Sequence, residues 1–464
     1  MSDQPTTTLA ASTLDGAIAV TRFGLGAREG EILTASHNPR QWLKSQLSVE
    51  RASPFSTAGI LDSKGYIMGI QRLQQRRKAQ SDPVLERSIV KAYNDKNRTL
   101  IAKEHRARFA YGMNTQLPFQ ERLVRFWSNH FSVSGQSRRN LKAATHEREA
   151  IRPAIMGSFY ELALSAILHP AMLLFLDNAN SIGPNSEMGL RSTRKRKGLN
   201  ENLAREVLEL HTLTPRGGYT QNDVTEFAKA LTGWTIGEVS APPAIQGVTV
   251  FSENSHEPGR RRILNKTYLP LGQDLAPVII RNVCGHPETA ANVAFKLAKH
   301  FVADTPPPSL VETLKQTFIL TGGYLPAVYE ALIDAPESWE PRQQKIKTPD
   351  DLLTSTARLL GEKPTFPTLR RDVYEGFGQR PFTAPTPEGW PDNIDAWLGP
   401  DAVTKRIEWA STVAEGLPNI DARKFLTDAL GPRVSEKTVQ LVAGAESGEQ
   451  ALVIALMSPE FQRR

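Results

Sequence analysis

The sequence predicts a mainly α protein, a multi-helix globular bundle with one small β-hairpin near residues 246–270. Three observations support this prediction. Apolar residues recur at helical spacing along most of the chain. Helix starts are marked by capping residues followed by proline or acidic residues, and runs that alternate apolar with polar residues are rare. With 464 residues, 40% of them hydrophobic, the chain can bury one large core or two moderate ones.

The clearest helices begin at capping threonines. Thr220 stands three residues before Asp223, and the apolar positions that follow lie on one face of a helix. Thr348 precedes Pro349, which predicts a second helix start of the same kind. The same periodicity predicts helices at 38–48, 84–112, 116–130, 141–168, 287–303, 308–319 and 402–415.

The remaining segments read as strands or loops. Residues 246–253 alternate apolar with polar side chains, and 262–270 is the expected partner strand of a hairpin. Loops are expected at 178–199, 236–247 and 362–397. The last of these is rich in proline, glycine and aromatic residues, a composition typical of a linker or of a binding loop.

This pattern predicts how the chain is organised. Residues 1–361 are expected to form the main helical domain, with its core in 116–303. The Pro/Gly-rich loop 362–397 follows, and helices in 398–464 are expected to pack on the same core.

Composition and charge exclude several classes of protein. The single cysteine, Cys284, excludes an internal disulfide and a Cys-cluster metal site. Lys plus Arg number 56 against 49 acidic residues, a mild excess without interleaved aromatics near the basic runs, so a nucleic-acid partner is disfavoured. The first twenty residues show no signal peptide and no apolar run is long enough to span a membrane, so a cytoplasmic protein is expected.

The densest set of ionisable groups lies in NENLAREVLELHTLTPRGGYTQNDVTEFAKALTGW, residues 200–234. Asn200 is a good helix N-cap, and Glu201, Arg205 and Glu209 then fall at i, i+4 and i+8. The simpler interpretation is a structural ion ladder along one face of this helix.

The alternative interpretation is a buried acidic catalytic site. Glu206 or Glu209 would act there as a base or metal ligand, with Arg205 and His211 beside them. Glu209 and His211 are two residues apart and point about 200° apart on a helix, so they cannot face one ion unless the helix ends there. The stretch contains neither Glu-x-x-His nor His-Glu-x-x-His spacing, which disfavours di-iron and zinc sites of those kinds.

A metal site would therefore have to be assembled from distant segments. His146 and Glu149, at i and i+3, form the one local His–carboxylate pair, and His130 is a further candidate ligand. A divalent metal is thus a candidate cofactor, although for each single histidine a hydrogen-bonded structural role is the more common one.

A separate candidate site binds an anion or a substrate. The turn SHEPGRRR brings His256, Arg260 and Arg261 together, a composition suited to a phosphate or carboxylate and equally to a solvated turn. Asn178 and Asn200 add amide groups within otherwise apolar segments, where burying them without a partner is costly.

Several stretches in the same order resemble one bacterial family, domain-of-unknown-function family 1800. They are RFGLGA (22–27), RFWSNHFSV (125–133), HPAMLLFLDNANS (169–181), NENLAREVLELHTL with GGYTQNDVTEFAKALTGW, HEPG (256–259), KIKTPDDL (345–352), GWPDNIDAW (389–397) and SPEFQRR (458–464). The resemblance covers nearly the whole chain and implies a fold but no established reaction. Two positions depart from the family pattern: Glu257 stands where the family has aspartate, and Leu213-Thr214 where it has Leu-Gly.

The resemblance also implies a partner. Genes of the family often neighbour one for a protein exported by the twin-arginine route, so a paired system and co-export to the periplasm are expected alternatives to a cytoplasmic protein. Three functions stay open at this point: an enzyme with acid–base or metal-assisted chemistry, a non-catalytic assembly partner that docks through 191–198 and 362–397, and a weak nucleic-acid binder.

Overall fold

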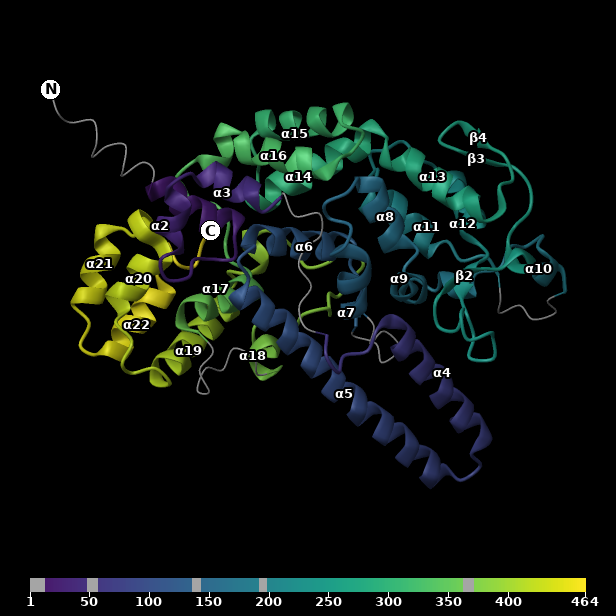
Figure 1. The fold of residues 1–464 in the computed structure, drawn as a ribbon, viewed down its shortest axis with the longest axis horizontal. Coiled ribbons are helices and arrows are strands. Elements are labelled where there is room, and N and C mark those ends of the chain that lie inside the picture. Colours follow the sequence, from purple (N-terminus) through teal and green to yellow (C-terminus); the bar gives the residue numbers. More distant parts are fainter. Residues whose placement is uncertain (1–12, 48–56, 136–142, 192–197, 362–370) are drawn as a thin grey trace.

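The structure is a computed structural model that describes residues 13–47, 57–135, 143–191, 198–361 and 371–464. Helices dominate it and the strands are few and short, so the mainly α prediction is confirmed (Figure 1). Within these described ranges no helix is long and apolar enough to cross a membrane.

Helices make up most of the chain, one group before residue 235 in the sequence and a second group after it. The first comprises α2 (Glu31–Ser36), α3 (Pro39–Ser45), α4 (Ser63–Ala79), α5 (Pro83–Asn114), α6 (Pro118–His130), α7 (Ala143–His146), α8 (Phe159–Ile167), α9 (Pro170–Phe175), α10 (Glu187–Arg191), α11 (Asn202–Glu206) and α12 (Gln221–Leu231). The second comprises α13 (Leu275–Cys284), α14 (Pro287–Phe301), α15 (Pro308–Leu320), α16 (Leu325–Asp334), α17 (Pro349–Leu360), α18 (Arg371–Gly376), α19 (Pro400–Glu415), α20 (Ala422–Leu430), α21 (Glu436–Ala443) and α22 (Gly448–Met457).

Local sequence signals explain where several helices begin. Thr220 and Asp223 form the reciprocal capping box at the start of α12, and Thr348 accepts a hydrogen bond from the Asp351 amide at the start of α17, as predicted. The single helix expected over 141–168 is wrong. Pro153 lacks an amide hydrogen, and the chain leaves the helical path there before α8 begins.

The strands pair differently from the prediction. β1 (Trp234–Ile236) pairs with β2 (Thr249–Phe251), and β3 (Arg261–Ile263) pairs with β4 (Lys266–Tyr268), each antiparallel. The expected pairing of 246–253 with 262–270 is therefore wrong. Leu264 and Asn265 both have positive φ, which closes a two-residue turn and gives β3 its partner in the immediately following residues.

Buried apolar side chains form two clusters. The larger extends in sequence from Ala17 to Trp339, and the second joins Phe109 and Met113 of α5 to α17 and the C-terminal helices. The helices of 398–464 thus share a cluster with α17, whereas the sequence placed them on the core of 116–303. The predicted domain boundaries themselves stay a prediction.

Most of α4 and the first turns of α5 stand apart from both clusters. α4 and α5 run antiparallel and project from the body as a long two-helix arm, whose tip lies at the 79–83 turn (Figure 1). The far end of α5 returns to the body and supplies a side chain beneath the cavity described next.

Candidate functional site

A cavity of about 650 Å³ lies between α6, α14, the start of α17 and the segment 379–393. That volume suits a small organic molecule, for which pockets of about 300–1,000 Å³ are usual. The Pro/Gly-rich segment predicted at 362–397 is here part of the cavity wall, with residues 379–393 forming a roof; its residues 362–370 lie outside the described chain.

Helix α14 presents a polar face to the cavity. Asn292, Lys296 and His300 line it at i, i+4 and i+8, whereas Val293 and Leu297 face the larger core. This is the spacing at which residues share one side of a helix. The same helix therefore buries an apolar stripe and offers a cationic one.

Helix α6 divides its faces in the same way. Arg125, Asn129 and His130 line the cavity, while Trp127 on the opposite side donates from Nε1 to the Tyr329 hydroxyl at 2.6 Å. The tryptophan fixes the rotation of α6 and so fixes which of its residues face the cavity.

The end of the 200–211 helical segment anchors three cavity side chains through its backbone. The α-helical turns of α11 widen into a π-helical segment, Val207–His211, where the helix ends. Carbonyls at a helix end have no partner within the helix. The carbonyls of residues 210–212 each accept a hydrogen bond from a side chain that lines the cavity. Leu210 O accepts from Lys296 Nζ at 2.9 Å, His211 O from His130 Nε2 at 3.1 Å, and Thr212 O from Asn292 Nδ2 at 2.8 Å.

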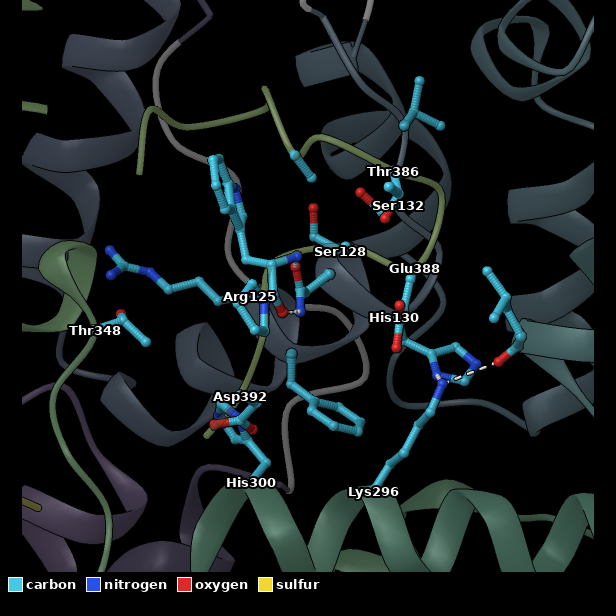
Figure 2. A pocket seen from close by; sticks show the side chains of 18 of the residues that line it. Arg125, Ser128, His130, Ser132, Lys296, His300, Thr348, Thr386, Glu388 and Asp392 are labelled. Carbon is cyan, nitrogen blue, oxygen red and sulfur yellow. Dashed lines mark hydrogen bonds and ion pairs between the residues drawn. The ribbon is translucent and has the colours of Figure 1, made fainter. Parts of the chain in front are cut away.

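These bonds define the state of His130. Because a carbonyl can only accept, Nε2 of His130 must carry the hydrogen, and Nδ1 is left as an acceptor. Lys296 Nζ lies 3.5 Å from that Nδ1. Lys296 therefore directs two hydrogens at fixed acceptors, Leu210 O and His130 Nδ1, and has one remaining position on its nitrogen (Figure 2).

Burial sets the protonation of this pair. Burial lowers the pKa of Lys296 to about 8, with the carboxylate of Glu388 acting in the opposite direction. Burial, reinforced by Lys296 and His211, holds the pKa of His130 well below its ordinary value. Among the residues that the structure describes, no ion pair joins Lys296 to a carboxylate. The exposed Glu388 of the roof is another cavity-lining residue (Figure 2).

A second buried lysine provides a contrast. Burial also lowers the pKa of Lys347, to about 7. Its amine, however, donates to Ser355 Oγ at 3.0 Å, lies 3.8 Å from the Phe461 ring centroid, and does not line the cavity. Of the two lysines, only Lys296 can meet a ligand there.

The roof is attached to α6 through an asparagine. Asn129 donates from Nδ2 to Trp390 O at 2.9 Å and accepts from Trp390 N at 2.8 Å. Gly389 packs directly on this contact with φ of 92°, and a Cβ there would lie 2.5 Å from the Asn129 carbonyl oxygen. The Gly-Trp pair of GWPDNIDAW is thus required by the close approach of two backbones.

Beyond Trp390, charged side chains around Asp392 hold the roof in place. Asp392 accepts from His300 Nδ1 at 2.8 Å and pairs with Lys345 at 2.9 Å, and the buried Arg464 side chain lies 3.9 Å away. Burial would raise the pKa of Asp392, but His300 and the two cations hold it far below its ordinary value. The roof therefore has a fixed position relative to α14.

Below the cavity and partly lining it, six side chains, each at most 16% exposed, form a closed ring of alternating charge, with N···O distances between 2.6 and 3.7 Å. Its members in order are Arg108, Glu147, Arg152, Glu121, Arg125 and Asp350, which returns to Arg108. Each charge has an opposite charge on both sides. Burial alone would raise the pKa of Glu121, but Arg152 overrides it and keeps the pKa below its ordinary value. This ring ties α5, α6 and α17 together.

Some residues predicted for the catalytic site lie in the cavity and others do not. Glu209 lines it, but Glu206 does not, and burial together with Glu209 raises the pKa of Glu206. Arg205 pairs with Glu201 at 3.1 Å near the surface, so the expected ladder has one rung there. His211 is fully buried beside His130, with burial lowering its pKa to about 3 and neither ring nitrogen bonded to any described residue.

The predicted metal ligands have other partners. His146 lines the cavity, but its Nε2 bonds to Ala166 O at 3.0 Å, and Glu149 lies 3.2 Å from His169 Nε2. The helix changes from α to π between His146 and Glu149, so their i, i+3 spacing does not bring them together. Over the described ranges no three His, Cys, Asp or Glu side chains are grouped as a metal would need, and the predicted site with His130 gains no support.

The predicted anion site is internally satisfied. Arg261 donates to the carbonyls of Glu257 and Pro258 and lies 3.3 Å from Glu226. His256 Nδ1 bonds to Thr232 O at 2.8 Å, and Arg260 points to solvent. None of these residues lines the cavity.

The two asparagines have structural roles. Asn178 donates to the carbonyls of Leu231 and Trp234, which holds the end of α12. Asn200 accepts from the Asn202 amide at 2.8 Å, and α11 begins at Asn202 rather than directly after Asn200.

Sequence reasoning missed Lys296 and Glu388. Lys296 lies in a helix predicted from its apolar face, and a lysine among core positions was the available signal. Glu388 lies in a segment predicted as a loop, and nothing in its local sequence indicates that the segment folds over α6.

The fold and cavity define a helical protein with a roofed cavity of about 650 Å³. The sequence profile described as "Protein of unknown function (DUF1800)" matches residues 18–463, and the chain belongs to this family. Neither the search of curated proteins nor that of solved structures gave a match.

Proposed function

We propose that the protein is an enzyme that binds a small polar molecule under the 379–393 roof and transfers protons with the amine of Lys296. One observation carries the proposal. Lys296 lines the cavity with two of its nitrogen positions occupied by Leu210 O and His130 Nδ1, and the third is left for a ligand.

The lowered pKa gives this amine a usable neutral form. With a pKa of about 8, roughly a quarter of the amine is uncharged at pH 7.5, against about 0.1% for an ordinary lysine. The neutral amine has its lone pair at the third position and can remove a proton from a ligand. The charged form presents an N–H at the same position and can return the proton.

The neighbouring groups have supporting roles in this proposal. Neutral His130 is a positioning residue, because its Nδ1 accepts from the amine while its Nε2–H is held by His211 O. Glu388 stabilises the charged form of Lys296 electrostatically. Asn129 and Gly389 keep the roof in place, which excludes bulk water from the reacting groups.

The acid–base form of the enzyme hypothesis is the better supported one. It needs only side chains that line the cavity, whereas a metal-assisted form would need a ligand group that the described residues do not assemble.

A depletion assay tests the proposal. A small-molecule extract is incubated with the wild type and with Lys296→Met, and each pool is followed by mass spectrometry between pH 6.5 and 9. We expect at least one compound to be consumed by the wild type alone, faster toward pH 8. Consumption by both proteins at the same rate, or by neither, would refute the proposal.

The partner and the compartment form a separate proposal. Because the resemblance implies a neighbouring exported protein, we propose that the two associate and are exported together. Cell fractionation with and without the neighbour tests this, and recovery of the protein in the cytoplasm in both cases would count against it.

A further inference from the structure

The two-helix arm of α4 and α5 carries the positive charge of the whole protein. Residues 63–114 contain twelve lysines and arginines against four acidic residues, a surplus of +8, while the entire chain has +7. Ten of these cations are exposed. A mild average charge therefore hides one strongly basic projection (Figure 1).

The tip of the arm is apolar and rigid. Val84 and Leu85 are 66% and 48% exposed in the first turn of α5. Pro83 fixes the backbone before them, and Asp82 caps the helix by accepting from the Val84 amide at 2.8 Å. Two aliphatic side chains are thus held in solvent at the point farthest from the body.

Cations surround this tip on all sides. Arg76, Arg77 and Lys78 are consecutive, so they point in directions about 100° apart around α4. Arg87 and Lys91 lie on α5 within about 12 Å of the 79–83 turn, at 1.5 Å per residue. Two acidic residues lie among these cations: Glu86 is paired with Arg77 at 2.7 Å, and Asp82 accepts a hydrogen bond from the Val84 amide.

We propose that the tip of this arm binds the surface of an anionic lipid bilayer, with Val84 and Leu85 entering the interfacial layer and the surrounding cations contacting lipid phosphates. Membrane binding of this kind combines buried apolar area with electrostatic attraction of Lys and Arg to anionic lipids, and the tip offers both. The projecting shape lets the tip reach a flat surface without obstruction from the body.

The distribution of side chains favours a bilayer over a nucleic acid. A nucleic acid lying along the arm would require cations on one face and aromatic side chains for stacking. The cations instead lie on all sides of the arm, and no Phe, Trp or Tyr of residues 63–114 is exposed. A phosphate backbone would also offer no apolar surface for Val84 and Leu85 to contact.

Vesicle sedimentation with the full chain tests the proposal. The wild type should sediment with vesicles of phosphatidylcholine containing about a third phosphatidylglycerol, and remain soluble with pure phosphatidylcholine. Arg76→Gln/Arg87→Gln should lower the partition coefficient by about 20- to 30-fold, since each cation at an anionic surface contributes roughly fivefold. Val84→Ser/Leu85→Ser should lower it at least about tenfold.

A matched control has the same charge loss elsewhere. Lys405 and Lys437 are exposed on α19 and α21, and Lys405→Gln/Lys437→Gln should bind vesicles within about twofold of the wild type. Equal loss in this control, or no loss in the Val84/Leu85 variant, overturns the proposal. So does tight binding of duplex RNA that is unaffected by the Val84/Leu85 change, in the absence of vesicle binding.

A fluorescence measurement reports insertion directly. Cys284 is the single native cysteine and is buried, so Leu85→Cys can be labelled selectively with a polarity-sensitive fluorophore. Anionic vesicles should shift its emission to the blue, while the same label at Lys437→Cys should not respond. An unshifted spectrum for Leu85→Cys under conditions where the protein sediments would refute insertion of the tip.

Discussion

Two ionic regions border the cavity, the ring that includes Arg125 of α6 and the pair of Lys296 with His130, and they are built on opposite principles. In the ring below the cavity, every charge has an opposite charge on both sides. At the cavity wall, Lys296 has a carbonyl and a neutral imidazole as its partners. In the ring, opposite charges offset the cost of burying each charged group, so the ring stabilises the fold. Lys296 has no carboxylate in an ion pair with it, so its amine can change its charge.

The largest expected effect concerns activity. Lys296→Met should reduce turnover of the compound found by depletion by about 10²- to 10⁴-fold, the usual contribution of a general acid–base group. The measurement is kcat and KM for the purified proteins. Lys299 also lines the cavity but donates to no acceptor among the described residues, and Lys299→Met should lose less than about tenfold in kcat. An equal loss in both variants would remove the special role assigned to Lys296.

Substitutions in the ring should instead lower the stability of the fold. Arg152→Met deprives Glu121 and Glu147 of a shared cation and should lower the free energy of unfolding by about 3–5 kcal/mol in urea denaturation. Arg205→Met, which removes a surface ion pair, should cost less than about 1 kcal/mol. By contrast, Lys296→Met should leave the protein as stable as the wild type or more stable. A loss of several kcal/mol in Lys296→Met would make the two regions equivalent.

The pH dependence of stability separates the regions further. The pKa of Lys296 in the folded protein, about 8, is below its unfolded value of about 10.5, so between these values the unfolded state binds more protons. The stability of the wild type relative to Lys296→Met should therefore rise from pH 8 to pH 10.5 by roughly 3 kcal/mol, and stay level below pH 8. Because Lys347 is present in both proteins, its own titration cancels. If the stability difference between the two proteins does not change between pH 8 and pH 10.5, burial does not lower the pKa of Lys296.

A smaller effect is expected at the roof. Asn129→Ala leaves the amide and carbonyl of Trp390 without partners and should destabilise this contact by about 1–3 kcal/mol. Amide exchange at Trp390 should accelerate and KM should rise, while the urea midpoint of the whole protein changes little. Unchanged exchange at Trp390 would show that the roof is held by Asp392 and its partners alone.

Much of the fold could be predicted from the sequence because its signals are local. The capping box of Thr220 and Asp223 lies within four residues, and apolar periodicity needs only a few turns of chain. Strand pairing failed because 262–270, predicted as one strand, contains a turn at Leu264 and Asn265 that folds it back on itself as β3 and β4.

The site was harder to predict from the sequence because it depends on contacts between distant segments. The ring draws on four separate parts of the chain between Arg108 and Asp350, so no spacing within one segment indicates it. The 200–211 helix was singled out for its ionisable side chains, but its end holds cavity residues through the carbonyls of residues 210–212, and the side chains of Glu206 and His211 do not line the cavity. Backbone groups leave no trace in side-chain patterns.

The most direct measurement is the titration of Lys296 itself. Reductive methylation with ¹³C-formaldehyde labels every lysine, and the resonance missing from Lys296→Met assigns this one by NMR. We predict that it titrates near pH 8, distinct from the exposed lysines near about 10.5. A Lys296 resonance that titrates near 10.5 would contradict the account, because the amine would then be an ordinary cation with no neutral form to use at neutral pH.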